Sequence, residues 1–347
     1  MSSVALFGQL VIGGFPGPSL PAPFAAALRD GRRGGAILFR PNLEGGIEQV
    51  ASLTAAIHDA TSGAPPLVAI DQEGGRVARL KAPLLVVPPM RSIAERADTR
   101  LAERIARAVG AELGALGFTI DFAPVLDVNT CAENPVIGDR AFGDDPRTCA
   151  RYGAAWIAGL QSSGLLACGK HFPGHGDTSM DSHVDLPVVH QSAERIAAVE
   201  LVPFRAAVES NVASMMTAHV VYPALDPARP ATLSPAVCTD LRRAIGFTGM
   251  LVSDDLEMQA IAARMPVGEA AVLAVAAGCD ALLVCWSDEK QELAVEALAR
   301  EAEQSASFRA RCVEASTRVL AARRRVTARR VTRGALAEVV GGVESRA

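Results

Sequence analysis

The chain has 347 residues, of which 50% are hydrophobic and 21% charged, and its formal net charge is −4. This composition is typical of a globular protein with a sizeable core. The slightly acidic balance gives no overall field that would attract nucleic acid or an anionic membrane, so neither is an expected partner.

Two local features bear on the same question. The most apolar stretch, residues 270–286, is interrupted by Gly278 and Asp280 and is too short for a membrane span. Six arginines lie between Arg323 and Arg333 without interleaved aromatic residues. That pattern favours a solvated helix face over a nucleic-acid patch.

The cysteines and the amino terminus indicate the cellular compartment. The seven cysteines are scattered and none belongs to a CxxC pair, which favours reduced thiols over a disulfide framework or a zinc site. The first basic residue is Arg29, whereas a secretory signal begins with basic residues. We therefore expect a cytoplasmic protein.

Short β-rich runs alternate with longer alanine-rich segments along the chain. The expected strands cover residues 4–12, 35–39, 67–70, 119–124, 165–168, 214–218, 250–253 and 281–285. Apolar spacing typical of amphipathic helices is found in residues 47–60, 99–116, 146–163, 193–210 and 267–277. Eight strands, each followed by a helix, predict an α/β fold, a single-domain (β/α)₈ TIM-type barrel. We expect the barrel to span residues 1–335, with a disordered tail over residues 336–347. The alternative is a doubly wound sheet, but its Gly-rich phosphate fingerprint is missing after the first strand.

Polar residues follow the expected strands almost every time. They are Arg40, Asp71, Asp127, Lys170, His171, His219, Asp254 and Asp255. A helix N-cap role would account for Asp71 or Asp255 alone, but Lys170 and His171 are poor caps. Since barrel enzymes carry their sites at the carboxyl ends of the strands, we expect one shared polar pocket there.

The loop KHFPGHGDTSMDSHVDLP, residues 170–187, holds Lys170, three His and three Asp in eighteen positions. His171 and His175 have the spacing of a metal pair, but Pro173 and Gly174 prevent a helical face between them. No matching ligand cluster occurs elsewhere, so we expect neither a metal nor another cofactor.

Four segments carry a resemblance to a known family. They are IDQEGGRVARL (70–80), NPVIGDRAFG (134–143), KHFPGHGDTSMDSH (170–183) and LVSDDLEM (251–258). They resemble the signature segments of glycoside hydrolase family 3, in particular those of its single-domain bacterial β-N-acetylhexosaminidases. The likeness runs from about residue 3 to the helices before residue 330.

The resemblance implies the catalytic groups. Asp254, the first acid of LVSDDLEM, would be the nucleophile of a retaining glycosidase, and Asp255 a cap or supporting residue. The DSH triplet matches the place where the single-domain subfamily uses an Asp–His dyad, so His183 would be the acid/base and Asp181 its orienting partner. An imidazole titrates near neutral pH, which suits that role.

The resemblance also implies the residues that contact the sugar. They are Asp71, Arg79, Arg140, Lys170 and His171. A carboxylate such as Asp71 can accept hydrogen bonds from two neighbouring hydroxyls. Neither Arg76 nor Asp127 can be given a role from the sequence.

The expected function is that of an exo-acting β-N-acetylglucosaminidase that acts through a covalent glycosyl-enzyme intermediate. The resemblance implies muropeptides of peptidoglycan recycling, or similar small β-glycosides, as substrates, and we expect a monomer or weak homodimer. Three alternatives stay open: a β-glucosidase, a β-N-acetylglucosaminide phosphorylase, and a non-catalytic sugar-binding protein. The last has no use for Asp254 together with the Asp181–His183 pair. The sequence leaves the aglycone and the choice between water and phosphate open.

Overall fold

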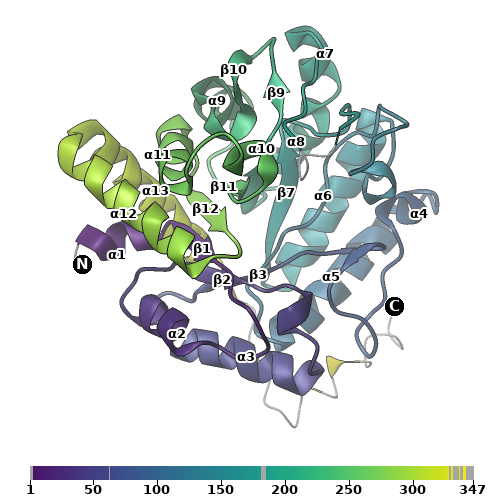
Figure 1. The fold of residues 1–347 in the computed structure, drawn as a ribbon. Helices are drawn as coiled ribbons and strands as arrows, with labels where there is room; N and C mark the ends of the chain where they lie inside the picture. The colour runs from purple at the N-terminus through teal and green to yellow at the C-terminus, as the bar shows by residue number, and fades with distance from the viewer. Residues whose placement is uncertain are drawn as a thin grey trace.

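The computed structural model describes residues 3–61, 63–180 and 185–327, together with residues 330, 336, 339 and 340. Within these residues eight parallel strands close into a barrel surrounded by helices (Figure 1). In barrel order the strands are β1 (Val11–Gly13), β12 (Ala281–Val284), β11 (Met250–Asp255), β8 (Ser214–Thr217), β7 (Leu166–Phe172), β6 (Ile120–Asp121), β3 (Leu67–Ile70) and β2 (Gly35–Ile37). The predicted (β/α)₈ barrel is confirmed.

The barrel strands are continuous apolar runs because parallel strands are covered on both faces. Every residue in the eight strands is buried except Asp254, which is only partly buried near the end of β11. The buried strand β11 thus brings one partly exposed carboxylate, that of Asp254, to the carboxyl end of the barrel.

Helices of varied length cover the barrel. They are α1 (Ser3–Gly8), α2 (Ala22–Arg29), α3 (Ile47–Asp59), α4 (Met90–Ala94), α5 (Thr99–Ala115), α6 (Pro146–Ser162), α7 (Ala193–Ala198), α8 (Leu201–Glu209), α9 (Arg242–Ala244), α10 (Gln259–Ala262), α11 (Val267–Ala277), α12 (Asp288–Gln304) and α13 (Ala306–Arg324). Two small antiparallel pairs, β4 (Gln72–Gly74) with β5 (Val77–Ala78) and β9 (Val221–Tyr222) with β10 (Asp226–Pro230), lie in the connections.

The long helices begin where the sequence supplies a cap. The Asp98 carboxylate accepts the backbone N–H groups of Arg100 and Leu101 at the start of α5. Asp145 accepts the N–H of Thr148 at the start of α6, whose first residue is a proline. These are the residue types that satisfy the free N–H groups of a first turn, which explains why the predicted helix starts were accurate.

Two predicted elements differ from the structure. Residues 3–8 form α1, which contacts α12 and α13, and only Val11–Gly13 of the expected strand 4–12 pairs in the barrel. A short apolar run has no periodicity that separates a buried helix from a strand. The expected helix 193–210 is broken between α7 and α8, where Val199 has a non-helical backbone and the buried Glu200 pairs with Arg195.

The basic run also differs in part from the prediction. Arg324, Arg325 and Arg330 are exposed, but Arg323 is buried, so a solvated face is wrong for that residue. Its guanidinium donates to the carbonyl oxygens of residues 64 and 65 and to the Gln9 side chain. Burial lowers the pKa of Arg323 to about 10. The arginine therefore ties α13 to the amino-terminal end of the barrel.

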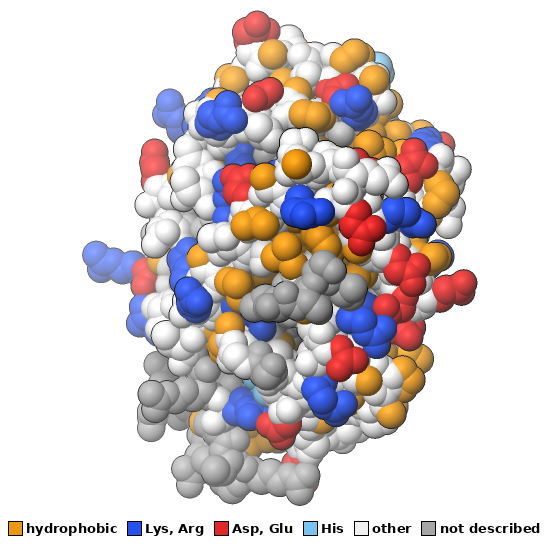
Figure 2. Space-filling view, turned by 90° about the vertical axis from the view of Figure 1, so that its left-hand side faces the viewer, with side chains coloured by type: hydrophobic (Ala, Val, Ile, Leu, Met, Phe, Trp, Pro, Cys, Tyr) orange, Lys and Arg blue, Asp and Glu red, His pale blue; other side chains and the backbone are white. Residues whose placement is uncertain are grey.

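Surface and thiol chemistry agree with the composition. Acidic and basic side chains are interspersed on the face shown in Figure 2. The seven cysteines are free thiols. Among the described residues, no helix combines the length and the apolar character that a membrane crossing needs.

Within the expected tail, Leu336 and Val340 are buried and the Val340 N–H donates to the Leu336 carbonyl, so these two residues pack on the core.

A buried carboxylate holds the amino-terminal end of β12. Asp280 precedes the strand, and its two oxygens accept from Arg242 at 2.8 Å, Arg311 at 2.7 Å and Arg318 at 3.1 Å. It also accepts the backbone N–H of Leu251 at the start of β11. One side chain therefore joins two strands to α9 and α13.

We expect Asp280→Ala to lower the free energy of unfolding by about 3 kcal/mol, because it leaves a buried cluster of guanidinium groups without its carboxylate. Partial exposure of Arg311 and Arg318 keeps the loss near the lower end of the range for buried pairs. Urea unfolding of the variant and the wild type measures this loss in the free energy of unfolding. The control is Asp240→Ala, whose carboxylate is 69% exposed and 3.9 Å from Arg243, and which should change the free energy by less than about 0.5 kcal/mol. Equal losses in the two variants would contradict this role for Asp280.

Candidate functional site

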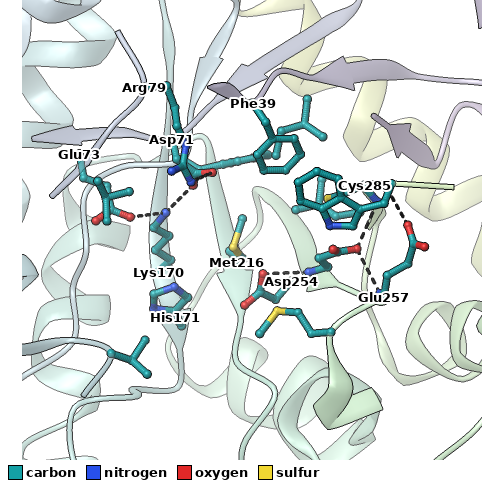
Figure 3. A pocket seen from close by; sticks show the side chains of 18 of the residues that line it. Phe39, Asp71, Glu73, Arg79, Lys170, His171, Met216, Asp254, Glu257 and Cys285 are labelled. Atoms are coloured by element: carbon teal, nitrogen blue, oxygen red, sulfur yellow. Dashed lines mark hydrogen bonds and ion pairs between the residues drawn. The ribbon is translucent and has the colours of Figure 1, made fainter. Parts of the chain in front are cut away.

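The carboxyl ends of the strands surround a pocket of about 560 Å³. Its lining includes side chains that follow or end β2, β3, β7, β11 and β12, with the partly buried Asp254 among them (Figure 3). The expectation of one shared polar pocket is met by Asp71, Lys170, His171, Asp254 and Asp255, which all line it.

An ionic network forms one wall of the pocket. The Lys170 ammonium lies 2.8 Å from Asp71 and 2.6 Å from Glu73. The Arg140 guanidinium binds both oxygens of Glu73, at 2.9 and 2.8 Å. Glu73 and Lys170 are almost fully buried, so each charge depends on its partners. Asp71, Glu73, Lys170 and Arg140 are called the Lys170 network below.

The charges in the Lys170 network stabilise one another. Burial by itself raises the pKa of Glu73, but Arg140 and Lys170 outweigh burial and hold that pKa well below its usual range. Burial by itself lowers the pKa of Lys170, but Asp71 and Glu73 outweigh it and raise that pKa above its usual value. Glu73 and Lys170 are therefore charged at neutral pH, and the network presents fixed donors and acceptors to a ligand.

Arg79 extends the wall from the β4–β5 hairpin. Its guanidinium lies 3.5 Å from the Asp71 carboxylate, and its buried Nε has no hydrogen-bond partner among the described residues. Gln72 fixes the hairpin because its side-chain oxygen accepts the N–H groups of Arg79 and Leu80. Arg79 thus lines the pocket beside Asp71.

Asp127 orients His171. The Asp127 carboxylate lies 2.7 Å from Nδ1 of His171 and accepts the backbone N–H groups of His171 and His175. Burial raises the pKa of Asp127, but the contact with His171 outweighs it and lowers that pKa. With Nδ1 held in this way, Nε2 of His171 is the ring nitrogen left for the pocket. Asp127, which we expected in the pocket without a definite role, does not line it and is therefore a supporting residue of His171.

The acids at the end of β11 have different surroundings. Asp254 lines the pocket, and its Oδ1 accepts the Asp255 N–H at 2.8 Å. Asp255 is buried, and its Oδ1 accepts the N–H groups of Glu257 at 3.1 Å and Cys285 at 3.2 Å. Burial, with Glu257 and Asp254 nearby, raises the pKa of Asp255 to about 7. His219 is buried behind them and bonds to the Asp255 carbonyl.

This arrangement suits a polyhydroxylated ligand. The Lys170 network supplies charged donors and acceptors on one side, and Asp254 is a carboxylate within the same pocket. Residues 12–322 match the model of the glycosyl hydrolase family 3 N-terminal domain. The chain belongs to glycoside hydrolase family 3.

Relatives of known name or structure agree with that membership. A β-hexosaminidase from Thiobacillus denitrificans is 44% identical over 280 residues, which are 79% of this chain and 76% of that protein. A family 3 β-N-acetylglucosaminidase from Paenibacillus sp. has a TM-score of 0.90 and 38% identity, over 100% of this chain and 69% of that one. NagZ from Neisseria gonorrhoeae, in complex with N-trifluoroacetyl-D-glucosamine, has a TM-score of 0.75 and 31% identity, over 89% of this chain and 98% of that one. The predicted family and the prediction of a glycoside hydrolase are confirmed.

The structure of this family 3 enzyme brings most of the predicted site residues together. Asp71, Arg79, Arg140, Lys170, His171 and Asp254 all line the pocket. Asp181 and His183, the predicted acid/base pair, lie outside the described residues. Among the residues that are described, no group of three or more His, Cys, Asp or Glu side chains is arranged to hold a metal ion.

Sequence reasoning missed two acids of the site. Glu73 holds Lys170 and Arg140, and Glu257 accepts the backbone N–H groups of Trp286 and Ser287. A signal for Glu73 was present, since residues two apart in an extended segment point to the same side, and Asp71 was already assigned to the pocket. Glu257 gave no such signal, because its partners follow another strand.

The raised pKa of Asp255 makes the stability of the enzyme depend on pH. From about pH 4 to pH 7 the unfolded chain ionises Asp255 while the folded chain keeps it protonated, so a rise in pH favours unfolding. Asp255→Asn removes that titration, and its side-chain oxygen can still accept both N–H groups. As the pH rises from 4 to 8, we expect the free energy of unfolding of the variant to increase by roughly 2 to 4 kcal/mol relative to that of the wild type.

Urea unfolding across this pH range measures the difference. Asp144→Asn, at an exposed carboxylate, is the control and should follow the wild type. A constant difference between Asp255→Asn and the wild type would show that Asp255 ionises alike in the folded and unfolded chains.

Proposed function

We propose that this glycoside hydrolase is a retaining exo-β-N-acetylglucosaminidase that forms a covalent glycosyl-enzyme intermediate on Asp254. One observation carries the proposal. Asp254 is the single residue of the eight barrel strands that is not buried, and it lines a pocket shared with the Lys170 network. A nucleophile and a hydroxyl-binding wall are what a retaining glycosidase needs on its own strands.

The names of the relatives support N-acetylglucosamine as the terminal sugar of the substrate. They are called β-hexosaminidase and β-N-acetylglucosaminidase, and the NagZ structure is a complex with an N-acylated glucosamine. The inner part of the pocket supports exo action, since its lining includes Ile37, Phe122 and Met216, which belong to the buried core. A pocket that ends on the core accepts a terminal sugar and not the middle of a chain.

The wall of the pocket suits sugar hydroxyls. Asp71 can accept from two adjacent hydroxyls, while Lys170, Arg140, Arg79 and His171 offer donors. Because the Lys170 network is already paired and ordered, little reorganisation is needed when a sugar binds. The wall would therefore hold the sugar ring in one orientation with its anomeric carbon at Asp254.

Catalysis would proceed in two displacements at the anomeric carbon. Asp254 attacks that carbon while His183 gives a proton to the departing oxygen, so the aglycone leaves as a neutral alcohol. His183 then takes a proton from water, which attacks the same carbon and releases Asp254. Two inversions give net retention. Asp181 would hold the imidazole and stabilise its charged form.

The finer expectations rest on the resemblance of the sequence. Muropeptides of peptidoglycan recycling, or similar small β-glycosides, are the substrates that we propose. The cytoplasmic setting and the monomer or weak homodimer stay predictions from the sequence.

Asp254→Ala should lower kcat by roughly a thousandfold or more, because the group that forms the covalent bond is lost. Azide should restore turnover of a dinitrophenyl glycoside and give the α-glycosyl azide, since it enters from the face that the carboxylate occupied. A 5-fluoro N-acetylglucosaminyl fluoride should label Asp254 in the wild type, as mass spectrometry of peptides can show. A label on Asp255, or turnover without any label, would contradict the nucleophile.

The same assay tests the substrate. 4-Nitrophenyl N-acetyl-β-glucosaminide should be hydrolysed with a higher kcat/KM than the corresponding glucoside, and added phosphate should not change the product. Preference for the glucoside would make the enzyme a β-glucosidase. Formation of the sugar 1-phosphate would make it a phosphorylase.

The leaving group tests the proton donor. His183→Ala should depress hydrolysis of a disaccharide far more than release of dinitrophenolate, because a stable anion needs little protonation. Asp181→Asn should show a milder form of the same pattern. Comparing kcat/KM over a series of aryl glycosides measures the effect. A loss that does not depend on the leaving group would assign His183 to binding or folding.

A further inference from the structure

Trp286 is unusually exposed for its size. Its side chain lines the pocket directly after β12 and is 59% exposed, whereas Trp156, the other tryptophan of the chain, is fully buried. An indole ring is a large apolar surface with a single N–H donor, and such rings are enriched where a ligand or partner covers them. Because Trp286 lines the pocket, a ligand bound there would cover the exposed indole ring.

Trp286 stacks on a second ring. Its centroid lies 4.5 Å from that of Phe39, and the two planes are inclined by 18°. Phe39 follows β2 and has the Arg79 guanidinium 5.9 Å from its centroid. The Trp286 indole N–H donates to no acceptor among the described residues. Trp286 and Phe39 together are called the aromatic platform.

The aromatic platform is fixed relative to Asp254. The backbone N–H groups of Trp286 and Ser287 donate to Glu257 at 2.7 and 3.2 Å, and Glu257 also pairs with Lys290 at 3.2 Å. Glu257 lies three residues beyond Asp254, in the turn that directly follows β11. The segment that positions the proposed nucleophile therefore positions the indole as well.

The pocket has two sides of different chemistry. Figure 3 shows Glu73, Lys170 and His171 on one side, Phe39 and Cys285 on the other, and Asp254 between them. Hydroxyl-binding groups would hold the terminal sugar on the first side. The anomeric carbon would lie at Asp254, and the equatorial bond of a β-glycoside points away from the sugar ring, so the leaving group extends toward the second side.

We propose that the aromatic platform is the subsite for the first residue of the aglycone; this rests on the proposed function. It fits an aglycone that presents a flat apolar face, such as the C–H face of a pyranose or an aryl ring, with an acceptor for the Trp286 N–H. A small alkyl aglycone gains nothing from it. The platform selects the aglycone, and the Lys170 network selects the terminal sugar.

Trp286→Ala tests the proposal with three glycosides of N-acetylglucosamine and with the free sugar. Its kcat/KM should fall about tenfold for a β-linked disaccharide and for the phenyl glycoside, because stacking on the ring is lost. Its kcat/KM for the methyl glycoside and the inhibition constant of free N-acetylglucosamine should stay within about twofold of wild type. Trp286→Phe should recover most of the loss for the phenyl glycoside. Leu293→Ala, at a 44% exposed apolar residue outside the pocket lining, is the control and should match the wild type for all ligands.

Two outcomes would overturn the proposal. Equal losses for the methyl and phenyl glycosides, with weaker inhibition by N-acetylglucosamine, would place Trp286 against the terminal sugar. Unchanged kcat/KM for every glycoside would show that the platform touches no substrate.

Fluorescence separates this proposal from the proposed function. The phenyl 1-thioglycoside of N-acetylglucosamine should protect Trp286 from acrylamide quenching, and free N-acetylglucosamine should not. If the wild type cleaves no glycoside, the proposed function is wrong, and protection by the thioglycoside alone then decides whether the platform binds an aglycone.

Discussion

The pairing of Lys170 with two carboxylates is the constraint on which the pocket depends. A buried ammonium group is stable only with close counter-charges, and the barrel supplies them by placing the ends of β3 and β7 on either side of β6. Asp71 and Glu73 are balanced by Lys170 and Arg140. Asp121, at the end of β6, would add a third negative charge, but burial raises its pKa well above the usual value and so disfavours that charge.

The opposite side of the pocket is held by hydrogen bonds to backbone. Asp255 and Glu257 accept N–H groups from three consecutive residues after β12, so the end of β11 and the turn after it fix the segment that follows β12. Asp255 serves this purpose in a buried position where its charge is unfavourable, while Asp254 has access to the pocket. Two adjacent acids thus have different surroundings, and burial raises the pKa of Asp255.

Local signals explain why the barrel could be predicted and why parts of the site could not. Strand 67–70 and helix 267–277 were predicted with their observed bounds, since apolar runs, spacing and a following glycine mark them in the sequence. The helix at residues 3–8, the buried Arg323 and the role of Glu257 depend on partners far along the chain. The residues of the Lys170 network were recognised by resemblance, except Glu73, but their mutual contacts required the fold.

The two ends of the barrel contain buried charge clusters that differ in how much unbalanced charge they tolerate. At the amino-terminal end, one carboxylate of Asp280 faces three guanidinium groups, and the excess positive charge is acceptable because Arg311 and Arg318 reach solvent. At the carboxyl end, Glu73 and Lys170 have no such access, so their charges must balance within the protein. The amino-terminal cluster shares no residue with the pocket and holds β11 and β12 independently of it. A change of ligand-binding groups can therefore alter recognition while the barrel stays closed, provided that the balance around Lys170 is kept.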